Sequence, residues 1–346
     1  MKLIKLTAGK KLILLGVLLA ALVAVPFLIK DTYILHVIIL CFIYSCLALS
    51  LNLIIGLTGQ FSLGHVTFYG IGAYVTALLM LKAGMSFWPA ALISAVCVGI
   101  FGYLLALPAI NLRGDYLAVV TLGFGEVFRL FLVNAIGITR GPMGLPGIPA
   151  PKIGSFLINS KQEYYYLALI ILVAVVIFVR RLMVSGFGMA MLSVREDDIA
   201  ASAIGIYPRK YKLQAFVIGA VIAGVMGSFY AVYMSFISPS SFQYGESITM
   251  VSMVILGGMG SIAGPILGAC ILTVLPEALR SFSEYRMIIY GAALVIMMIF
   301  KPNGIWGLDK RVRNLYMLQL GRGVKDGKSA SGVQRNNPLR WFNGGR

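Results

Sequence analysis

Long uninterrupted runs of apolar residues constrain the fold of this chain more than any other feature. The run from Tyr33 to Leu57 contains no charged residue, and about 20 apolar residues are enough for a helix to cross a bilayer. Similar runs recur along the 346 residues, and only 12% of the residues are charged, against roughly 25% in ordinary globular domains. Too few polar side chains remain to cover a soluble surface. The sequence therefore predicts an all-α polytopic membrane protein.

Ten apolar segments have the composition of membrane helices, and Gly- or Pro-rich or charged stretches separate most of them. The segments are Leu12–Ile29, Tyr33–Leu57, Val66–Leu81, Trp88–Ile110, Tyr116–Ile138, Tyr164–Val179, Leu213–Phe236, one that starts near Ser247, Ile266–Leu279 and Met287–Phe300. The first exceeds the roughly 7–15 apolar residues of a signal peptide, which favours a retained helix. A glycine-rich break at residues 257–264 allows a re-entrant arrangement. We therefore expect about 8–10 transmembrane helices, some of them broken or re-entrant.

The positive charge of the chain is concentrated in three patches. The net charge is +17, and 20 of the 29 Lys and Arg residues lie in the first 11 residues, between residues 180 and 212, or from residue 301 onward. Lys and Arg mark the cytoplasmic side of a membrane protein, where anionic lipid attracts them. This distribution predicts cytoplasmic N- and C-termini and contact with membrane lipid, and it argues against a nucleic-acid partner. The predicted organisation is a basic arm (1–11), a transmembrane domain (12–305) with a cytoplasmic loop (185–211), and a basic, partly disordered tail (306–346).

The cytoplasmic loop has the pattern of two short helices. Gly205 is placed to end the second helix, and Pro208 prevents its continuation. The acidic run Glu196–Asp198 suits the start of a helix. Small residues at 200, 201 and 203 allow another surface to approach closely. A solvated linker between two membrane spans is the alternative interpretation of the same residues.

Two similar glycine breaks interrupt apolar segments about 200 residues apart. Glycines at 56, 59 and 64 correspond to glycines at 257, 260 and 264. Paired interruptions of this kind suggest inverted-repeat-like halves and a transporter binding site, because broken helices expose N–H groups that suit a carboxylate. Close helix packing through small residues is the alternative. The candidate pathway residues are Gly56, Gly59, Gln60, Ser62, His65, Gly257, Gly258 and Gly260.

A second intramembrane feature is the pair Glu126 and Arg129, three residues apart on one helical face. Ionisable residues within a membrane span are costly unless they pair or line a polar path. The two residues are therefore expected to form an internal ion pair or to face the pathway.

Motifs for catalysis, metal binding and nucleotide binding fail on their spacing. Gly327-Lys328-Ser329 lacks the earlier glycine of a P-loop, since position 322 is Arg322. Ser62 is not in a G-x-S-x-G sequence, because position 60 is Gln60. The four cysteines have no metal-ligand spacing. We expect no catalytic or metal residues and no cofactor bound by this chain, which is not an enzyme in itself.

Three sequence blocks carry a resemblance to a known family. They are L-N-L-I-I-G-L-T-G-Q-F-S-L-G-H-V-T-F-Y-G-I-G-A-Y (51–74), V-R-E-D-D-I-A-A-S-A-I-G-I (194–206) and V-I-L-G-G-M-G-S-I-A-G-P-I-L-G-A (254–269). With their spans they cover roughly residues 33–305. The chain resembles the branched-chain amino-acid ABC transporter permeases of the LivM type. The tail after about residue 312 has no counterpart in this resemblance.

The resemblance implies the function and the partners. It implies a permease subunit of an importer for branched-chain or other hydrophobic amino acids in a bacterial-type inner membrane. The partners would be a homologous second permease, two ATP-binding subunits that use ATP-Mg, and an extracytoplasmic binding protein. The segment I-A-A-S-A-I-G is similar to the coupling loop of such permeases, although Ile199 stands where an acidic residue is usual. The implied coupling residues are Glu196, Asp197, Asp198, Ala200, Ala201 and Gly205.

Two alternative functions remain open at this point. Permeases of the same family carry urea or short amides, and the sequence does not identify the substrate. An ion-coupled secondary transporter would need intramembrane ionisable residues, for which Glu126, Arg129 and His65 are the few candidates.

Overall fold

Apolar helices form the body of the molecule, which we describe from a computed structural model. The structure describes residues 20–27, 31–110, 112, 114–154, 156–278, 291, 295 and 304–306. The chain divides into two units, Met1–Leu308 and Asp309–Arg346, and all described residues belong to the first. The predicted basic arm, the last predicted span and the predicted basic tail lie almost entirely outside the described residues.

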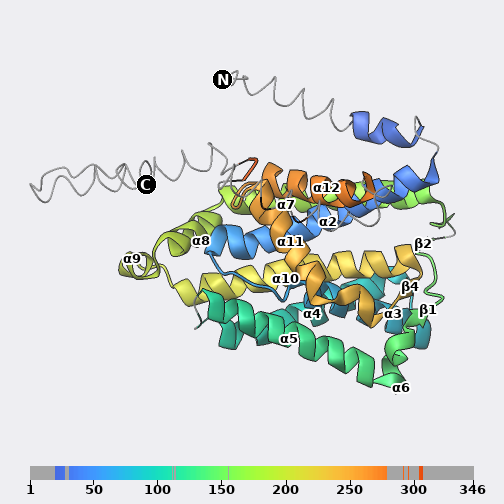
Figure 1. Cartoon of the computed structure of the whole chain (residues 1–346), viewed down its shortest axis with the longest axis horizontal. Helices are drawn as coiled ribbons and strands as arrows, with labels where there is room; N and C mark the ends of the chain where they lie inside the picture. The colour runs from blue at the N-terminus through green and yellow to red at the C-terminus, as the bar shows by residue number, and fades with distance from the viewer. Residues whose placement is uncertain are drawn as a thin grey trace, which may run out of the picture. The chain divides into compact units, whose positions relative to one another are not determined.

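Five described helices are long and apolar enough to cross a membrane. They are α2 (Thr32–Thr58), α4 (Phe87–Ala109), α5 (Asp115–Asn134), α7 (Lys161–Val184) and α10 (Pro208–Met234) (Figure 1). Residues 20–27 of the first predicted span are also helical. The fold prediction of an all-α polytopic membrane protein is confirmed.

Three shorter apolar helices complete the bundle in the described part of the chain. They are α3 (His65–Lys82), α11 (Tyr244–Gly257) and α12 (Ala263–Ala278). At 14 residues, α11 is about 21 Å long, whereas the hydrocarbon core is about 30 Å thick. It is a half-length helix, which accords with the expectation of broken or re-entrant segments.

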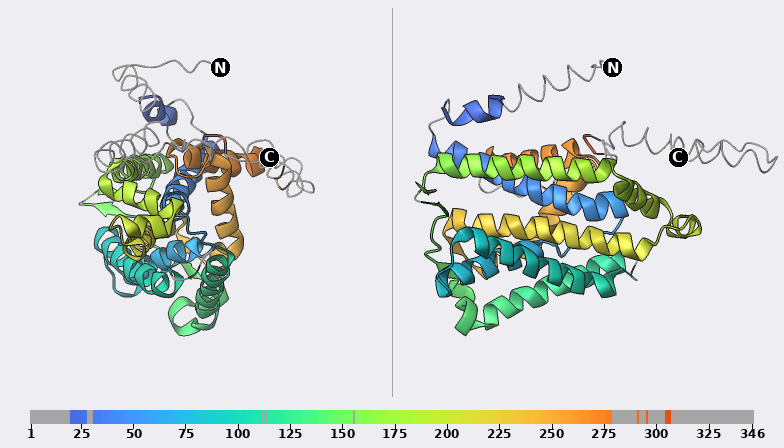
Figure 2. Two further views of the ribbon diagram at one scale, coloured as in Figure 1. Left: turned by 90° about the vertical axis from the view of Figure 1, so that its left-hand side faces the viewer. Right: turned by 180° about the vertical axis from the view of Figure 1, so that it is seen from behind.

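The connections gather at two opposite ends of the bundle (Figure 2). At one end lie the short helices α8 (Gly186–Glu196) and α9 (Asp198–Ala203). At the other end lie α6 (Ile136–Thr139), the 3-10 turn η1 (Gly141–Met143) and two small antiparallel sheets. In these sheets β1 (Leu145–Pro146) pairs with β4 (Phe236–Ile237), and β2 (Lys152–Ile153) pairs with β3 (Phe156–Leu157). The 3-10 turn η2 (Pro239–Phe242) then leads into α11.

Helix α2 occupies the centre of the bundle because it is apolar on every side. It packs against α7, α10, α11 and α12, and nearly all of its residues from Phe42 onward are buried. Helix α3 crosses α10 where a Cβ on Gly72 would overlap the backbone of Gly224, and a Cβ on Gly224 would overlap Val98 of α4. Small residues allow such close approach between membrane helices.

Helix α5 is the least buried of the five spans. Large apolar side chains on its outer face are exposed, including Val119, Val127, Leu130 and Phe131. Its inner face, by contrast, contacts α3, α4 and the start of α11. Helix α5 therefore lies at the edge of the bundle, with its outer face turned toward the surrounding membrane.

The candidate coupling and pathway site

The two glycine breaks lie against each other although some 200 residues separate them in sequence. Helix α2 ends at Gly59, whose left-handed backbone (φ 70°) turns the chain. Helix α11 ends before Gly258, and the hydroxyl of Tyr44 in α2 donates to Glu246 near the start of α11. The ends of the two helices therefore lie side by side.

Asn52 joins the two breaks by its side-chain amide. Its Nδ2 donates to the carbonyl of Ser261 at 2.7 Å, and its Oδ1 accepts from the backbone N–H of Gly260 at 2.8 Å. Asn52 is completely buried. A Cβ on Gly56 would overlap both the Asn52 amide and the backbone of Gly260, so this position requires glycine in the observed packing.

The second break is closed by a short segment near the end of the described chain. Ile305 and Trp306 donate their backbone N–H groups to the last carbonyls of α11. The hydroxyl of Ser261 donates to the carbonyl of Trp306 at 2.8 Å. The orphan carbonyls at the end of α11 are thereby satisfied.

Arg195 connects the α8–α9 loop to the first break. Its guanidinium donates to the carbonyl of Gly56, and its Cγ is the nearest neighbour of a Cβ built on Gly59. A charged hydrogen bond of this kind contributes about 1.5–3 kcal/mol. Arg195 thus joins α8 to the end of α2, and Asn52 joins that end to the second break.

The local chemistry of the loop matches the sequence pattern. Asp197 caps α9 by accepting from the backbone N–H groups of Ile199 and Ala200. Gly205 follows α9 with φ 83°, and the chain closes there with the paired hydrogen bonds of a Schellman turn. Asp198 forms an ion pair with Lys212 at the start of α10. These contacts stabilise the loop and join it to α10.

The tip of the loop presents an apolar surface. Ile199, Ile204 and Tyr207 are each more than 70% exposed, and Ala200 and Ala203 lie exposed between them. Ala201 is instead buried within the loop, so the small-residue face that the sequence suggested consists of Ala200 and Ala203. Glu196 is exposed at the end of α8. We define Ile199, Ala200, Ala203, Ile204 and Tyr207 as the α9 surface.

The polar residues that follow the first break are turned inward. Gln60, Ser62 and His65 are buried, and the His65 ring lies 2.7 Å from the hydroxyl of Ser50. A cavity of about 310 Å³ lies beside Gln60, between the end of α2 and the α8–α9 loop.

The N–H groups around the start of α3 are occupied by hydroxyl groups of the protein. Thr121 accepts from Leu63, and Ser247 accepts from Val66. In the observed conformation these N–H groups are therefore engaged and do not form an open carboxylate cradle.

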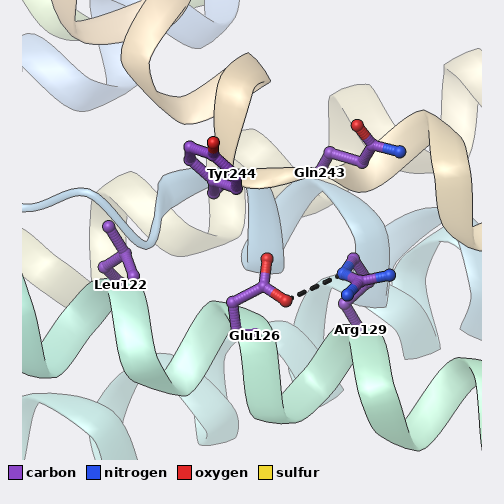
Figure 3. Close-up of a pocket in the computed structure, with 5 residues that line it drawn as sticks. All are labelled: Leu122, Glu126, Arg129, Gln243 and Tyr244. Carbon is purple, nitrogen blue, oxygen red and sulfur yellow. Dashed lines mark hydrogen bonds and ion pairs between the residues drawn. The ribbon is translucent and has the colours of Figure 1, made fainter.

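A second cavity lies between α5 and the start of α11. Arg129 Nε donates to Glu126 Oε2 at 2.9 Å, so the two residues are paired, as one of the two interpretations of their spacing predicts. Both side chains remain about 30% exposed. Figure 3 shows the pair on one side of the cavity, with Gln243 and Tyr244 opposite and Leu122 beside it. The cavity volume is about 390 Å³.

The residues that connect these features were not among the sequence candidates. Asn52 pairs with residues 208 and 209 positions away, and Arg195 with a residue 139 positions away. In the sequence, Asn52 is marked only as a single amide inside an apolar run, and Arg195 only as a single arginine beside an acidic run.

The comparisons with known proteins agree with this architecture. Residues 33–298 match the family model described as the branched-chain amino acid transport system permease component. The chain belongs to this family. It is 38% identical over 347 residues to the high-affinity branched-chain amino acid permease protein LivM of Escherichia coli K12, an alignment that covers 94% of the chain and 80% of LivM.

More distant relatives match a large part of the same chain. The permease protein LivH of Salmonella typhimurium is 27% identical over 76% of the chain and 91% of LivH. A probable LivM of Methanocaldococcus jannaschii is 25% identical over 62% of the chain and 67% of the relative. No solved structure matches the chain. The protein is thus a multi-pass membrane protein of a transport family whose relatives are named as permease components.

Proposed function

We propose that this chain is a membrane permease subunit of an ABC importer that moves branched-chain amino acids across a bacterial inner membrane. Support comes from the family match and from relatives named for that transport. The five apolar spans provide the membrane body. In this proposal the α8–α9 end faces the cytoplasm, as do both termini.

The proposed assembly places this chain beside a homologous second permease. Two ATP-binding subunits supply the energy with ATP-Mg, and an extracytoplasmic binding protein delivers the substrate. Relatives are named both LivM and LivH, which supports a system with more than one kind of permease. The chain itself binds no nucleotide in this proposal, because its single P-loop-like sequence lacks the required glycine.

The observation that carries the proposal is the connection from the α9 surface to the two glycine breaks. An exposed apolar surface on a short helix outside the membrane body is suited to a protein partner. The loop that bears it is fixed to α10 by Asp198 and Lys212, and it contacts the break at Gly56 through Arg195. A partner that moves α9 would therefore move the ends of α2 and α11 together.

The mechanism follows from that connection. Closure of the ATP-binding subunits pushes on the α9 surface, and α8 transmits the displacement through the Arg195 guanidinium. The ends of α2 and α11 shift as one unit, since Asn52 holds them together. Repacking around the breaks then alternates access to the pathway. The binding protein supplies most of the selectivity, so the chain needs only a weak, transient substrate site.

The test is Ala203→Arg in the complete complex reconstituted in liposomes. Ala203 is exposed, so the arginine does not disturb the loop but places an unpaired charge in the proposed contact, where burial is costly. We expect ATP-driven leucine uptake to fall about tenfold or more, because 1.4 kcal/mol already corresponds to a factor of ten. The ATP-binding subunits should co-purify less well, while the permease still inserts.

Met143→Arg is the matched control, because Met143 is 83% exposed at the opposite end of the bundle. It adds the same charge and should leave co-purification of the ATP-binding subunits unchanged. Normal uptake by Ala203→Arg would remove the coupling role of the α9 surface. Uptake that survives ATP depletion but stops when the proton gradient is dissipated would instead identify a secondary transporter.

A further inference from the structure

Glu126 and Arg129 lie in an unusual place for a charged pair. They belong to α5, a candidate membrane span, yet about 30% of each side chain is exposed. Ionisable groups inside a membrane are costly in contact with lipid, and they usually face a protein interior or a water-filled cavity. Here they face the cavity of about 390 Å³. The cavity is therefore a place where a polar molecule could meet both charges.

The charges of the pair are complementary to a zwitterion. A free α-amino acid carries an ammonium and a carboxylate two bonds apart, and the pair offers one carboxylate and one guanidinium in direct contact at 2.9 Å. Guanidinium groups bind carboxylates with paired, charge-assisted hydrogen bonds. A bound zwitterion can therefore pair its carboxylate with Arg129 and its ammonium with Glu126.

The remaining walls suit the rest of a hydrophobic amino acid. Leu122 provides an apolar contact one helical turn before Glu126, while Gln243 and Tyr244 supply neutral polar groups (Figure 3). The volume lies within the roughly 300–1,000 Å³ of small-molecule sites.

The cavity is also mechanically connected to the two breaks. Gln243 precedes α11 and Tyr244 is its first residue, and the same helix ends at the second break beside Gly258. A displacement of that break therefore shifts the wall of the cavity that faces α5. This arrangement allows the cavity to change between an open and a closed form during transport.

We propose that the cavity between α5 and the start of α11 is the transient substrate site, in which Arg129 binds the carboxylate and Glu126 binds the ammonium of the transported amino acid. This inference rests on the proposed function and names the chemical class that the site accepts. It assigns a site that lies away from the glycine-break candidates of the sequence.

The first experiment measures access to the cavity with Leu122→Cys in the complete complex. A small hydrophilic thiol reagent should modify Leu122→Cys, and millimolar leucine should slow the reaction at least twofold. Leucinamide, which lacks the carboxylate, and 4-methylpentanoate, which lacks the ammonium, should give no protection. The matched control is Val127→Cys on the outer face of α5, which the membrane should cover, so the hydrophilic reagent should not modify it. The parent chain corrects for its native cysteines.

The second experiment neutralises the pair. Glu126→Gln and Arg129→Gln should each lower leucine uptake about tenfold or more, as expected for the loss of a charge-assisted bond to the substrate. ATP hydrolysis and assembly with the other subunits should persist. Asp115→Asn, at the exposed start of α5, is the control and should transport normally.

The double variant Glu126→Gln/Arg129→Gln separates binding from structure. A purely structural pair would recover function in the double variant, because no lone charge remains. If the pair binds the substrate, leucine uptake stays impaired in the double variant. The inference would be overturned by recovery of uptake in the double variant or by unchanged uptake in the single variants. It would also be overturned by protection of Leu122→Cys by all three compounds or by none, or by loss of the second permease from the complex.

The wild-type complex distinguishes this result from failure of the proposed function. If wild-type uptake of leucine does not depend on ATP, the proposed function fails. The labelling of Leu122→Cys still reports on the cavity in that case, because the reaction needs no ATP.

Discussion

Asn52 shows how one side chain can determine whether the two breaks stay together. We expect Asn52→Leu to lower the unfolding midpoint of the detergent-solubilised complex by several degrees. The leucine leaves the N–H of Gly260 and the carbonyl of Ser261 unpaired in a buried place, at about 1–3 kcal/mol for each group. Asn134→Leu is the control, because Asn134 is exposed and bonds only within its own helix. Equal unfolding midpoints for the two variants would contradict the role of Asn52 as a bridge between the breaks.

At the residue scale the sequence predicted the turns better than the contacts. Gly59 and Gly205 were predicted as break or end residues, and both have the left-handed backbone that favours glycine. The pairings of Asn52 and Arg195 were not predicted, because they depend on which distant segments pack together. Ala201 lay in a suggestive motif, but its burial is set by the closure of its own short helix. Local sequence patterns determine the backbone geometry of a turn, whereas pairing between distant side chains depends on the folded arrangement of the helices.

At the element scale, the crossing of α3 and α10 depends on glycine. A Cβ at Gly227 would overlap the carbonyl of Tyr69 and the backbone of Ala73 on α3. We expect Gly227→Leu to destabilise the protein by about 1–3 kcal/mol or more, the usual cost of overpacking. The measurement is the yield of monodisperse protein and its thermal midpoint after solubilisation. Gly123→Leu is the matched control, since no atom lies near a Cβ at that glycine; equal loss in both variants would contradict the role of this crossing.

The helices themselves were largely predictable, because membrane spans follow from composition and length. The predicted segments at residues 33–57, 88–110 and 213–236 correspond to α2, α4 and α10 within a few residues. The short α11 also agrees with the sequence, since the predicted segment starts near Ser247 and the glycine-rich break follows at residues 257–264. The cavity between α5 and the start of α11 depends on how these two distant segments pack together. Sequence periodicity alone therefore had no means of locating it.

At the scale of the whole molecule, the two ends differ in charge. At the α8–α9 end lie Arg180, Arg181, Arg195, Arg209, Lys210 and Lys212, and at the other end the described basic residues are Lys82, Arg140, Lys152 and Lys161. An excess of Lys and Arg in short loops marks the cytoplasmic side. The prediction of a cytoplasmic α8–α9 end follows from this distribution, and it puts the α9 surface on the side of the membrane where the proposed ATP-binding subunits would bind.

Labelling of intact cells tests that orientation. We expect a membrane-impermeant thiol reagent to modify Met143→Cys at once in intact cells, because this exposed residue lies at the end predicted to be extracytoplasmic. Ser202→Cys, exposed on α9, should react only after the membrane is permeabilised. The parent chain, whose Cys41 and Cys46 are buried, gives the background rate. Immediate labelling of Ser202→Cys from outside would reverse the topology, and the α9 surface would then be out of reach of any subunit that uses cytoplasmic ATP.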